Sequence, residues 1–229
     1  MRFRTVLFDL DGTLIDHLPA IHRSYGHTLP LLGLPAPTYE QVKRAIGGGL
    51  EKAMRNFVAE EELPRALQMY RAHWDQTMLE GASLLAGARE LLDWLKRHGV
   101  RTGVFTNKHG PSSRRVCEHL DVAGLLDGIF GATDTPWLKP QPEFARHVLA
   151  RMGSDASVTC LVGDSPFDVQ AAHHGGLAFA GVETGTHTRD ELLAAGAEVV
   201  VRDLVELRMR WQREGVDLGG TSLDATGAG

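Results

Sequence analysis

The segment TVLFDLDGTLID, residues 5–16, places two carboxylates, Asp9 and Asp11, directly after an apolar run. The β-branched and aromatic residues of TVLF, without polar alternation, are typical of a buried parallel strand. Asp11-Gly12 then marks a sharp turn. Two acids at a buried strand end cost free energy unless a positive charge lies between them. The segment therefore indicates either a solvated turn or a divalent-metal site with one carboxylate free for chemistry.

Length and composition narrow the class of protein. The 229 residues fit one large domain or a core with a modest insertion, and the net charge of −5 is dispersed along the chain. Without a basic block or a long apolar run, we expect neither nucleic acid nor a membrane as a partner. Asp9 and Asp11 interrupt the first apolar run too early for a signal peptide. Cys117 and Cys160 lack metal or disulfide spacing, so we expect a cytoplasmic protein.

Helical and strand patterns alternate with short connections from residue 84 to residue 205. Strands are predicted at 100–107, 128–132, 158–163, 177–182 and 197–201, with helices at 87–99, 111–126, 142–153 and 168–176. This alternation predicts an α/β fold, a Rossmann-like doubly wound parallel sheet formed by residues 1–17 and 83–215. Residues 18–82 show helical periodicity without a convincing strand, which predicts an inserted all-helical cap. The Gly-rich segment 216–229 is expected to be a disordered tail.

Polar residues follow several of the predicted strands, where an open parallel sheet binds its ligands. They are Asp9, Asp11 and Thr13 after the first strand, Thr106, Asn107 and Lys108, Lys139 in LKPQP, and Asp164 and Asp168 in GDSPFD. Taken singly, each has a structural explanation, such as a helix cap or a solvated charge. Taken together, acids, a hydroxyl and a lysine suit a phosphoryl group bridged to Mg²⁺.

The stretches DLDGTL, FTNK, LKPQPE and GDSPFD resemble, in order and spacing, the four motifs of the haloacid dehalogenase superfamily. Residues 18–82 resemble its α-helical cap, and TNKHG, VGDSPFDVQAA and IGGGLEKAM are similar to stretches of bacterial phosphoglycolate phosphatases. The resemblance implies a Mg²⁺-dependent phosphomonoester hydrolase that acts through an aspartyl-phosphate. Its substrate would be a small phosphorylated metabolite, with 2-phosphoglycolate as the first candidate.

The resemblance also implies a role for each motif residue. Asp9 would be the nucleophile, and Asp11 the general acid and base, which also gives its backbone carbonyl to the metal. Thr106 and Lys139 would hold the phosphoryl oxygens. Asp164 would complete the metal site with Asp9 and Asp11. These roles agree with the chemistry, because a carboxylate nucleophile needs a second acid to protonate the leaving group and then deprotonate water.

Other residues are assigned to the substrate or to support. Asp168 would support the metal site or orient Lys139, Asn107 would contact the phosphoryl group or the substrate, and Thr13 would stabilise the turn. Gly47, Gly48 and Gly49 precede a helix predicted to begin near Leu50, which would aim its N–H groups at a second anion of the substrate. The alternative interpretation of the three glycines is a plain turn between two helices.

Three alternatives remain beside this hypothesis. One is a phosphosugar phosphatase or mutase of the same superfamily, although Ile21 stands where a mutase histidine is expected, with His22 one position off, and Leu50 stands at the expected arginine. Another is dehalogenase activity, whose members lack the DxDGT pattern. The third is a non-enzymatic phospho-acceptor module, disfavoured by chain length and by acids on the first strand. The sequence leaves open whether the protein is a monomer or homodimer, and whether His17, His22 or His109 affect specificity.

Overall fold

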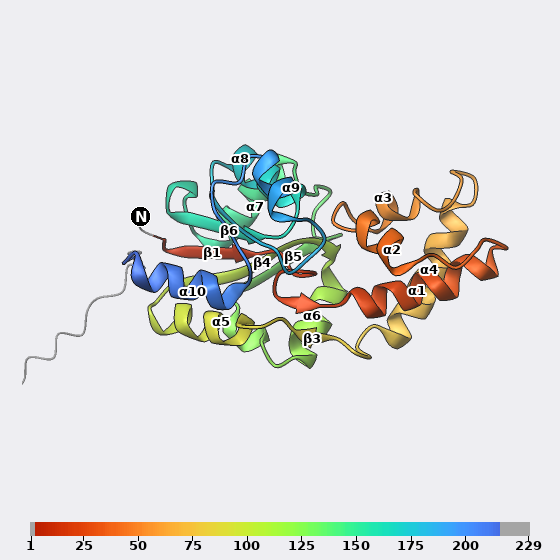
Figure 1. Ribbon diagram of the computed structural model, residues 1–229, viewed down its shortest axis with the longest axis horizontal. Coiled ribbons are helices and arrows are strands. Elements are labelled where there is room, and N and C mark those ends of the chain that lie inside the picture. The colour runs from red at the N-terminus through yellow and green to blue at the C-terminus, as the bar shows by residue number, and fades with distance from the viewer. Residues whose placement is uncertain (1–2, 216–229) are drawn as a thin grey trace, which may run out of the picture.

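The computed structural model describes residues 3–215, whose core is a six-stranded parallel sheet (Figure 1). The strand order is β5-β4-β1-β6-β7-β8, and every neighbouring pair is parallel. The strands are β1 Thr5–Phe8, β4 Arg101–His109, β5 Gly128–Ala132, β6 Thr159–Gly163, β7 Ala178–Val182 and β8 Val200–Val201. The order reverses direction at β1, so the predicted doubly wound sheet is confirmed and the carboxyl end of β1 lies at the switch point.

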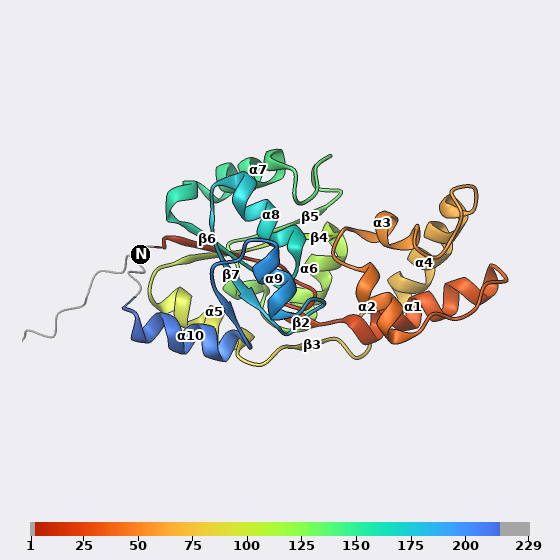
Figure 2. The ribbon, with the colours of Figure 1, turned by 45° about the horizontal axis from the view of Figure 1, so that its top comes forward.

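Helices cover both faces of this sheet. Figures 1 and 2 show α7, α8 and α9 on one face and α5, α6 and α10 on the other. Within β1, Val6 and Phe8 pack in the hydrophobic cluster on the α5 side, whereas Leu7 packs in the cluster on the α7 side. Both faces are thus apolar, which explains why TVLF lacks alternation. The helices are α5 Ala88–Arg97, α6 Gly110–His119, α7 Pro142–Met152, α8 Pro166–Gly175, α9 Arg189–Ala194 and α10 Leu204–Arg213.

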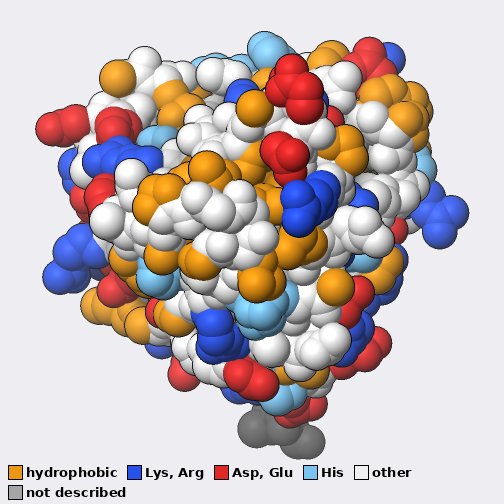
Figure 3. All heavy atoms as spheres, turned by 90° about the vertical axis from the view of Figure 1, so that its right-hand side faces the viewer, with side chains coloured by type: hydrophobic (Ala, Val, Ile, Leu, Met, Phe, Trp, Pro, Cys, Tyr) orange, Lys and Arg blue, Asp and Glu red, His pale blue; other side chains and the backbone are white. Residues whose placement is uncertain are grey.

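Residues 18–82 form four helices that lie together at one end of the molecule (Figures 1 and 2). They are α1 Leu18–Leu31, α2 Tyr39–Ala45, α3 Leu50–Met54 and α4 Leu63–Thr77. The longest two pack through aromatic side chains, with the rings of Tyr25 and Tyr70 5.1 Å apart. Figure 3 views this end, where acidic, basic and hydrophobic side chains are intermixed over the outer surface.

A short antiparallel ribbon links these helices to the sheet. Strand β2, Ile15–Asp16, enters α1 and pairs with β3, Ser83–Leu84, which returns from α4. Strands of two residues carry no periodicity, so the sequence pattern does not predict them. The ribbon places the two connections between the sheet and the helices side by side. Both connections lie at the predicted boundaries of the insertion, residues 18 and 82.

Some predicted elements differ from the structure. The helix predicted at 111–126 ends at His119, because Asp121 adopts a left-handed backbone with φ of 54°, and a separate 3-10 turn follows at Ala123–Leu125. Helices α9 and α10 are absent from the prediction. The tail predicted to be disordered, 216–229, lies outside the described residues.

The burial of a leucine in this structure predicts how much its substitution destabilises the protein. Leu91 on α5 is fully buried, whereas Leu193 on α9 is 44% exposed. Leu91→Ala should lower the free energy of unfolding by about 2–5 kcal/mol, since it removes buried methyl groups and leaves a cavity. Leu193→Ala should change it by about 0.5 kcal/mol or less. Denaturant unfolding of both variants checks this, and equal losses would contradict the described packing.

Candidate active site

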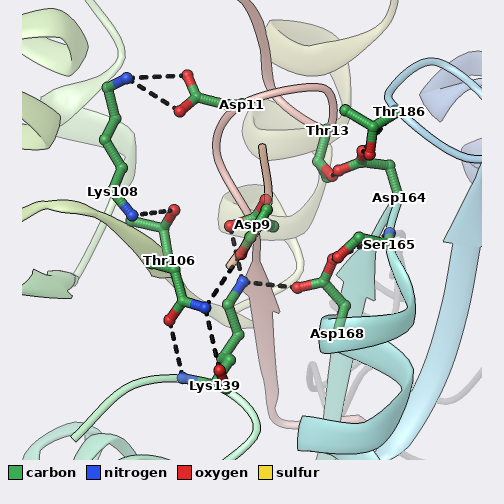
Figure 4. A network of polar contacts seen from close by, with 12 residues as sticks. Asp9, Asp11, Thr13, Thr106, Lys108, Lys139, Asp164, Ser165, Asp168 and Thr186 are labelled. Atoms are coloured by element: carbon green, nitrogen blue, oxygen red, sulfur yellow. Dashed lines mark hydrogen bonds and ion pairs between the residues drawn. The ribbon is translucent and has the colours of Figure 1, made fainter. Parts of the chain in front are cut away.

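The ammonium of Lys139 joins two buried carboxylates at the carboxyl end of β1 (Figure 4). Its Nζ donates to Asp9 Oδ1 at 2.7 Å and to Asp168 Oδ1 at 2.6 Å. The hydroxyl and backbone N–H of Ser165 hold the other oxygen of Asp168, at 2.6 and 3.1 Å. Burial opposes the charge on Lys139, but Asp168 and Asp9 outweigh burial and raise its pKa. Lys139 is therefore a permanent cation between these two acids.

Asp164, which directly follows β6, lies on the same side of Asp9 as Asp168 in Figure 4. Its Oδ1 accepts from the Thr13 hydroxyl at 2.9 Å, and its Oδ2 accepts from the Thr186 backbone N–H at 2.9 Å. Gly12, with φ of +84°, packs so closely that a Cβ would lie 2.7 Å from Asp164 Oδ2. The Thr13 hydroxyl thus holds Asp164, whereas the turn contains the backbone hydrogen bond from Thr13 N–H to the Leu10 carbonyl at 3.3 Å. Thr186, which follows β7, was not predicted, although the strand-end rule that found the other residues applies to it.

Three buried acids surround a place that a cation could occupy. Carboxylate oxygens of Asp9, Asp164 and Asp168 all lie within 4.8 Å of one another. Burial raises the pKa of Asp9 to about 6, against the charge of Lys139. Burial, with the charges of Asp9 and Asp168, raises the pKa of Asp164 to about 8. One ammonium does not neutralise three carboxylates, and hard oxygen ligands of this kind suit Mg²⁺. The donor set therefore fits the predicted ion, with Asp168 near it.

Asp11 faces a different set of partners. Its carboxylate accepts from Lys108 Nζ at 2.9 and 3.1 Å, and His17 Nδ1 lies 3.4 Å from Oδ1. Burial favours the neutral acid, but Lys108 and His17 outweigh it and lower the pKa of Asp11. His17 is itself buried and its Nε2 lies 2.5 Å from the Met78 carbonyl oxygen beyond α4. The sequence placed Lys108 at a strand end without giving it a role, and its pairing with Asp11 was not predicted.

These groups line a cleft of about 690 Å³ between the sheet and helices α1, α3 and α4. Asp9, Thr106 and Lys139 line it from the sheet side, and Tyr70 and Trp74 line it from α4. Thr106 is buried, and its hydroxyl acts to lower the pKa of Asp9, against the larger effect of burial. The predicted catalytic residues thus line one wall of the cleft, and aromatic side chains of α4 line another wall.

Asn107 and the three glycines connect the two walls. Asn107 Nδ2 donates to the Gly47 carbonyl at 3.0 Å and to the Lys139 carbonyl at 3.1 Å, while its Oδ1 accepts from Lys139 N at 2.8 Å. Gly47, Gly48 and Gly49 line the cleft, and α3 begins at Leu50 as predicted. A Cβ on Gly48 would lie 3.0 Å from the ring of Phe167. The glycine turn therefore packs against the sheet side of the cleft.

His22 and His109, the two other histidines considered for specificity, have different surroundings. His22 Nε2 lies 3.0 Å from the Pro37 carbonyl oxygen within the helical end, so its partner is local. His109 lines the cleft, and its Nδ1 lies 3.0 Å from the Ser112 hydroxyl. That hydroxyl also accepts from the indole N–H of Trp74 at 3.2 Å.

Comparison with known proteins agrees with this geometry. A family model described as haloacid dehalogenase-like hydrolase matches residues 6–182, which include all four motifs and the strands that carry them. The chain belongs to this family. The predicted superfamily is therefore confirmed.

Named relatives extend over most of this hydrolase. A Dickeya dadantii (strain 3937) protein named "Probable phosphatase IndB" is 33% identical over 208 residues, which cover 88% of this chain and 90% of that protein. A Rhodospirillum rubrum protein named "Phosphoglycolate phosphatase" is 32% identical over 215 residues, covering 89% of each. The crystal structure of a predicted phosphatase from Clostridium acetobutylicum has a TM-score of 0.85 at 26% identity, covering 93% of this chain and all of that one.

One property of the hydrolase bears on membranes. Among residues 3–215, each helix is too short or too polar to cross a lipid bilayer.

The raised pKa of Asp164 predicts a pH dependence of stability. Because its folded pKa of about 8 exceeds the ordinary value of 3.8, this carboxyl contributes stability below about pH 4 that is lost as the pH rises through 8. In a chelator, Asp164→Asn should therefore become more stable relative to the wild type between pH 5 and pH 9. Denaturant unfolding at both values measures the difference.

The exposed carboxylate of Asp190 offers a matched control. Asp190→Asn should follow the wild-type pH curve. Added Mg²⁺ should stabilise the wild type at pH 8 more than Asp164→Asn, because a ligand stabilises the state that binds it. If the free energies of unfolding of Asp164→Asn and the wild type changed with pH in the same way, the pKa of Asp164 would not be raised in the folded protein.

Proposed function

We propose that this phosphatase hydrolyses small phosphomonoesters by forming a phosphate ester on Asp9, with Mg²⁺ as cofactor and 2-phosphoglycolate as the substrate. One observation carries the proposal. The carboxylate of Asp9 lines the cleft while Lys139 Nζ holds its Oδ1 at 2.7 Å and Asp164 lies beside it. A nucleophile, a fixed cation for phosphoryl oxygens and a second acid for a metal thus meet at one point.

The reaction divides into two displacements. An oxygen of Asp9 bonds to phosphorus as the bond to the alcohol oxygen breaks, and Asp11 gives that oxygen a proton. Water then attacks the same phosphorus, Asp11 takes its proton, and the bond to Asp9 breaks to release inorganic phosphate. Lys139 and Thr106 stabilise the phosphoryl oxygens as charge develops. Asp168 and Asn107 act as positioning residues, since they hold the ammonium and the backbone of Lys139.

Mg²⁺ would be held by the carboxylates of Asp9 and Asp164 and by the backbone carbonyl of Asp11, with Asp168 close by. When bound, it would neutralise charge on the phosphoryl group and on these acids. For proton transfer, Asp11 must be protonated for part of the cycle, which requires its ion pair with Lys108 to loosen. That pair is therefore the part of the site most dependent on what enters the cleft.

We propose that residues 18–82 act as a cap hinged at the β2–β3 ribbon, on a core of residues 1–17 and 83–215. Three contacts support a closed arrangement. Arg44 of α2 pairs with Glu191 of α9 at 2.8 Å, and Trp74 and Gly47 contact the core through Ser112 and Asn107. Closure of this kind excludes water from the aspartyl ester. Saturation with an inert phosphate analogue should then protect the cleft from hydrogen exchange.

The choice of 2-phosphoglycolate follows the names of relatives at about 30% identity. The glycines at 47–49 are proposed to line its binding site. Their contacts with Phe167 and Asn107 also suit a role in seating the cap. A phosphosugar phosphatase keeps one supporting observation, because a cleft of about 690 Å³ admits molecules larger than a two-carbon ester.

The nucleophile is tested by Asp9→Asn. With p-nitrophenyl phosphate and saturating Mg²⁺, turnover should fall by about 10⁴-fold or more, because the amide forms no stable phosphate ester. Asp190→Asn, an exposed change of the same kind, should keep full activity. Circular dichroism should show both variants folded. Substantial turnover by Asp9→Asn, or full wild-type activity in excess chelator, would refute the mechanism.

Two further variants separate the acids. Asp11→Asn should lower kcat by about two to four orders of magnitude, which is the usual contribution of general acid–base catalysis. It should also keep Mg²⁺ affinity better than Asp164→Asn does, since Asp11 offers the metal only its backbone carbonyl. Calorimetric titration with Mg²⁺ compares the two affinities. Equal losses in both variants would show that the roles of Asp11 and Asp164 are wrongly assigned.

A further inference from the structure

The ammonium of Lys108 lies between the core and the aromatic wall of the cleft. Its Nζ donates to both oxygens of Asp11 and lies 4.5 Å from the centroid of the Trp74 ring. The side chain is 7% exposed and lines the cleft. The backbone N–H of Lys108 donates to the Thr106 hydroxyl at 3.2 Å, so one short segment carries both a predicted phosphoryl ligand and this cation.

The bonds of this ammonium leave donor capacity for a ligand. A lysine ammonium has three N–H donors, and among residues 3–215 the hydrogen bonds of Lys108 Nζ go to the two oxygens of Asp11. One donor thus remains at a buried position, where a charged hydrogen bond is stronger than in water. The face of the Trp74 ring, which the ammonium covers, attracts the cation and helps to hold it at this position.

Other cations that line the cleft are less suited to this task. Lys139 is shared by Asp9 and Asp168. The guanidinium of Arg55 is paired with Glu51 at 2.7 Å and Glu60 at 2.6 Å. Lys52 and Arg71 line the cleft but are exposed, so water and salt screen their charges.

We infer that Lys108 is the specificity-determining residue of this enzyme, binding a carboxylate that the substrate carries close to its phosphoryl group. The inference rests on the proposed hydrolysis at Asp9 and adds the class of substrate. A carboxylate fits better than a second phosphate, because one remaining donor on one cation matches a single negative charge. A phosphate dianion would need several donors. The position beside Asp11 limits the carboxylate to a short distance from the leaving oxygen.

Two esters that differ in one group test the inference. The quantity measured is the ratio of kcat/KM for 2-phosphoglycolate to kcat/KM for its neutral carboxamide, 2-phosphoglycolamide. The wild type should favour the acid by about 10- to 100-fold, the usual size of one hydrogen bond to a charged group. Lys108→Gln should bring the ratio close to 1, mainly through KM for the acid. Lys108→Arg should keep much of the preference, because the charge remains.

Arg71→Gln is the matched control, since it removes a cation that lines the same cleft but is exposed; its ratio should stay at the wild-type value. An unchanged ratio in Lys108→Gln would overturn the inference and leave Lys108 as a partner of Asp11 alone. A wild-type ratio near 1 would overturn it without any variant, as would loss of the preference in Arg71→Gln. Failure of the wild type to hydrolyse p-nitrophenyl phosphate would instead refute the proposed function itself.

Discussion

The buried ammonium of Lys139 is the charge on which the rest of the site depends. It bonds to Asp9 from the end of β1 and to Asp168 from the first turn of α8, and so ties together two segments that are far apart in the sequence. Asn107, at the end of β4, holds the backbone of Lys139 through two further hydrogen bonds. Removing one partner of such a buried pair leaves an uncompensated charge, which is strongly destabilising. The lysine is therefore fixed from three sides before any phosphate arrives.

The same cluster shows a conflict between stability and chemistry. Asp9, Asp164 and Asp168 stand closer together than their charges favour, and burial makes the ionised forms of Asp9 and Asp164 costly. A fold selected for stability alone would place fewer acids here. The proposed gain is a site that binds a divalent cation strongly, because the cation would neutralise negative charge that the protein has left in excess. The cation and Lys139 together would then attract the phosphoryl group. Ionisable groups with strongly shifted pKa values are common at functional sites.

Much of this site follows from the sequence, because a parallel sheet brings the carboxyl ends of its strands to one edge. If TVLF is a buried strand, the parallel sheet predicts that Asp9, Thr106 and Asp164 meet, and the contact of Asp168 with Lys139 is one of the two roles that the motif resemblance implies for Asp168. The sequence did not reveal that Lys108 turns to Asp11, since strand spacing does not fix the direction of a long flexible side chain. The ribbon of Ile15–Asp16 with Ser83–Leu84 was also missed, because two residues carry no pattern.

The account stands on a covalent phosphate at Asp9, and trapping that ester is its most direct test. Asp11→Asn should still form the ester from p-nitrophenyl phosphate, whose good leaving group needs little help from an acid, but should hydrolyse it slowly. Acid quenching, reduction with borohydride and peptide mass spectrometry should then find homoserine at position 9. Homoserine at another position, or unmodified Asp9 in an enzyme that is turning over, would contradict the account.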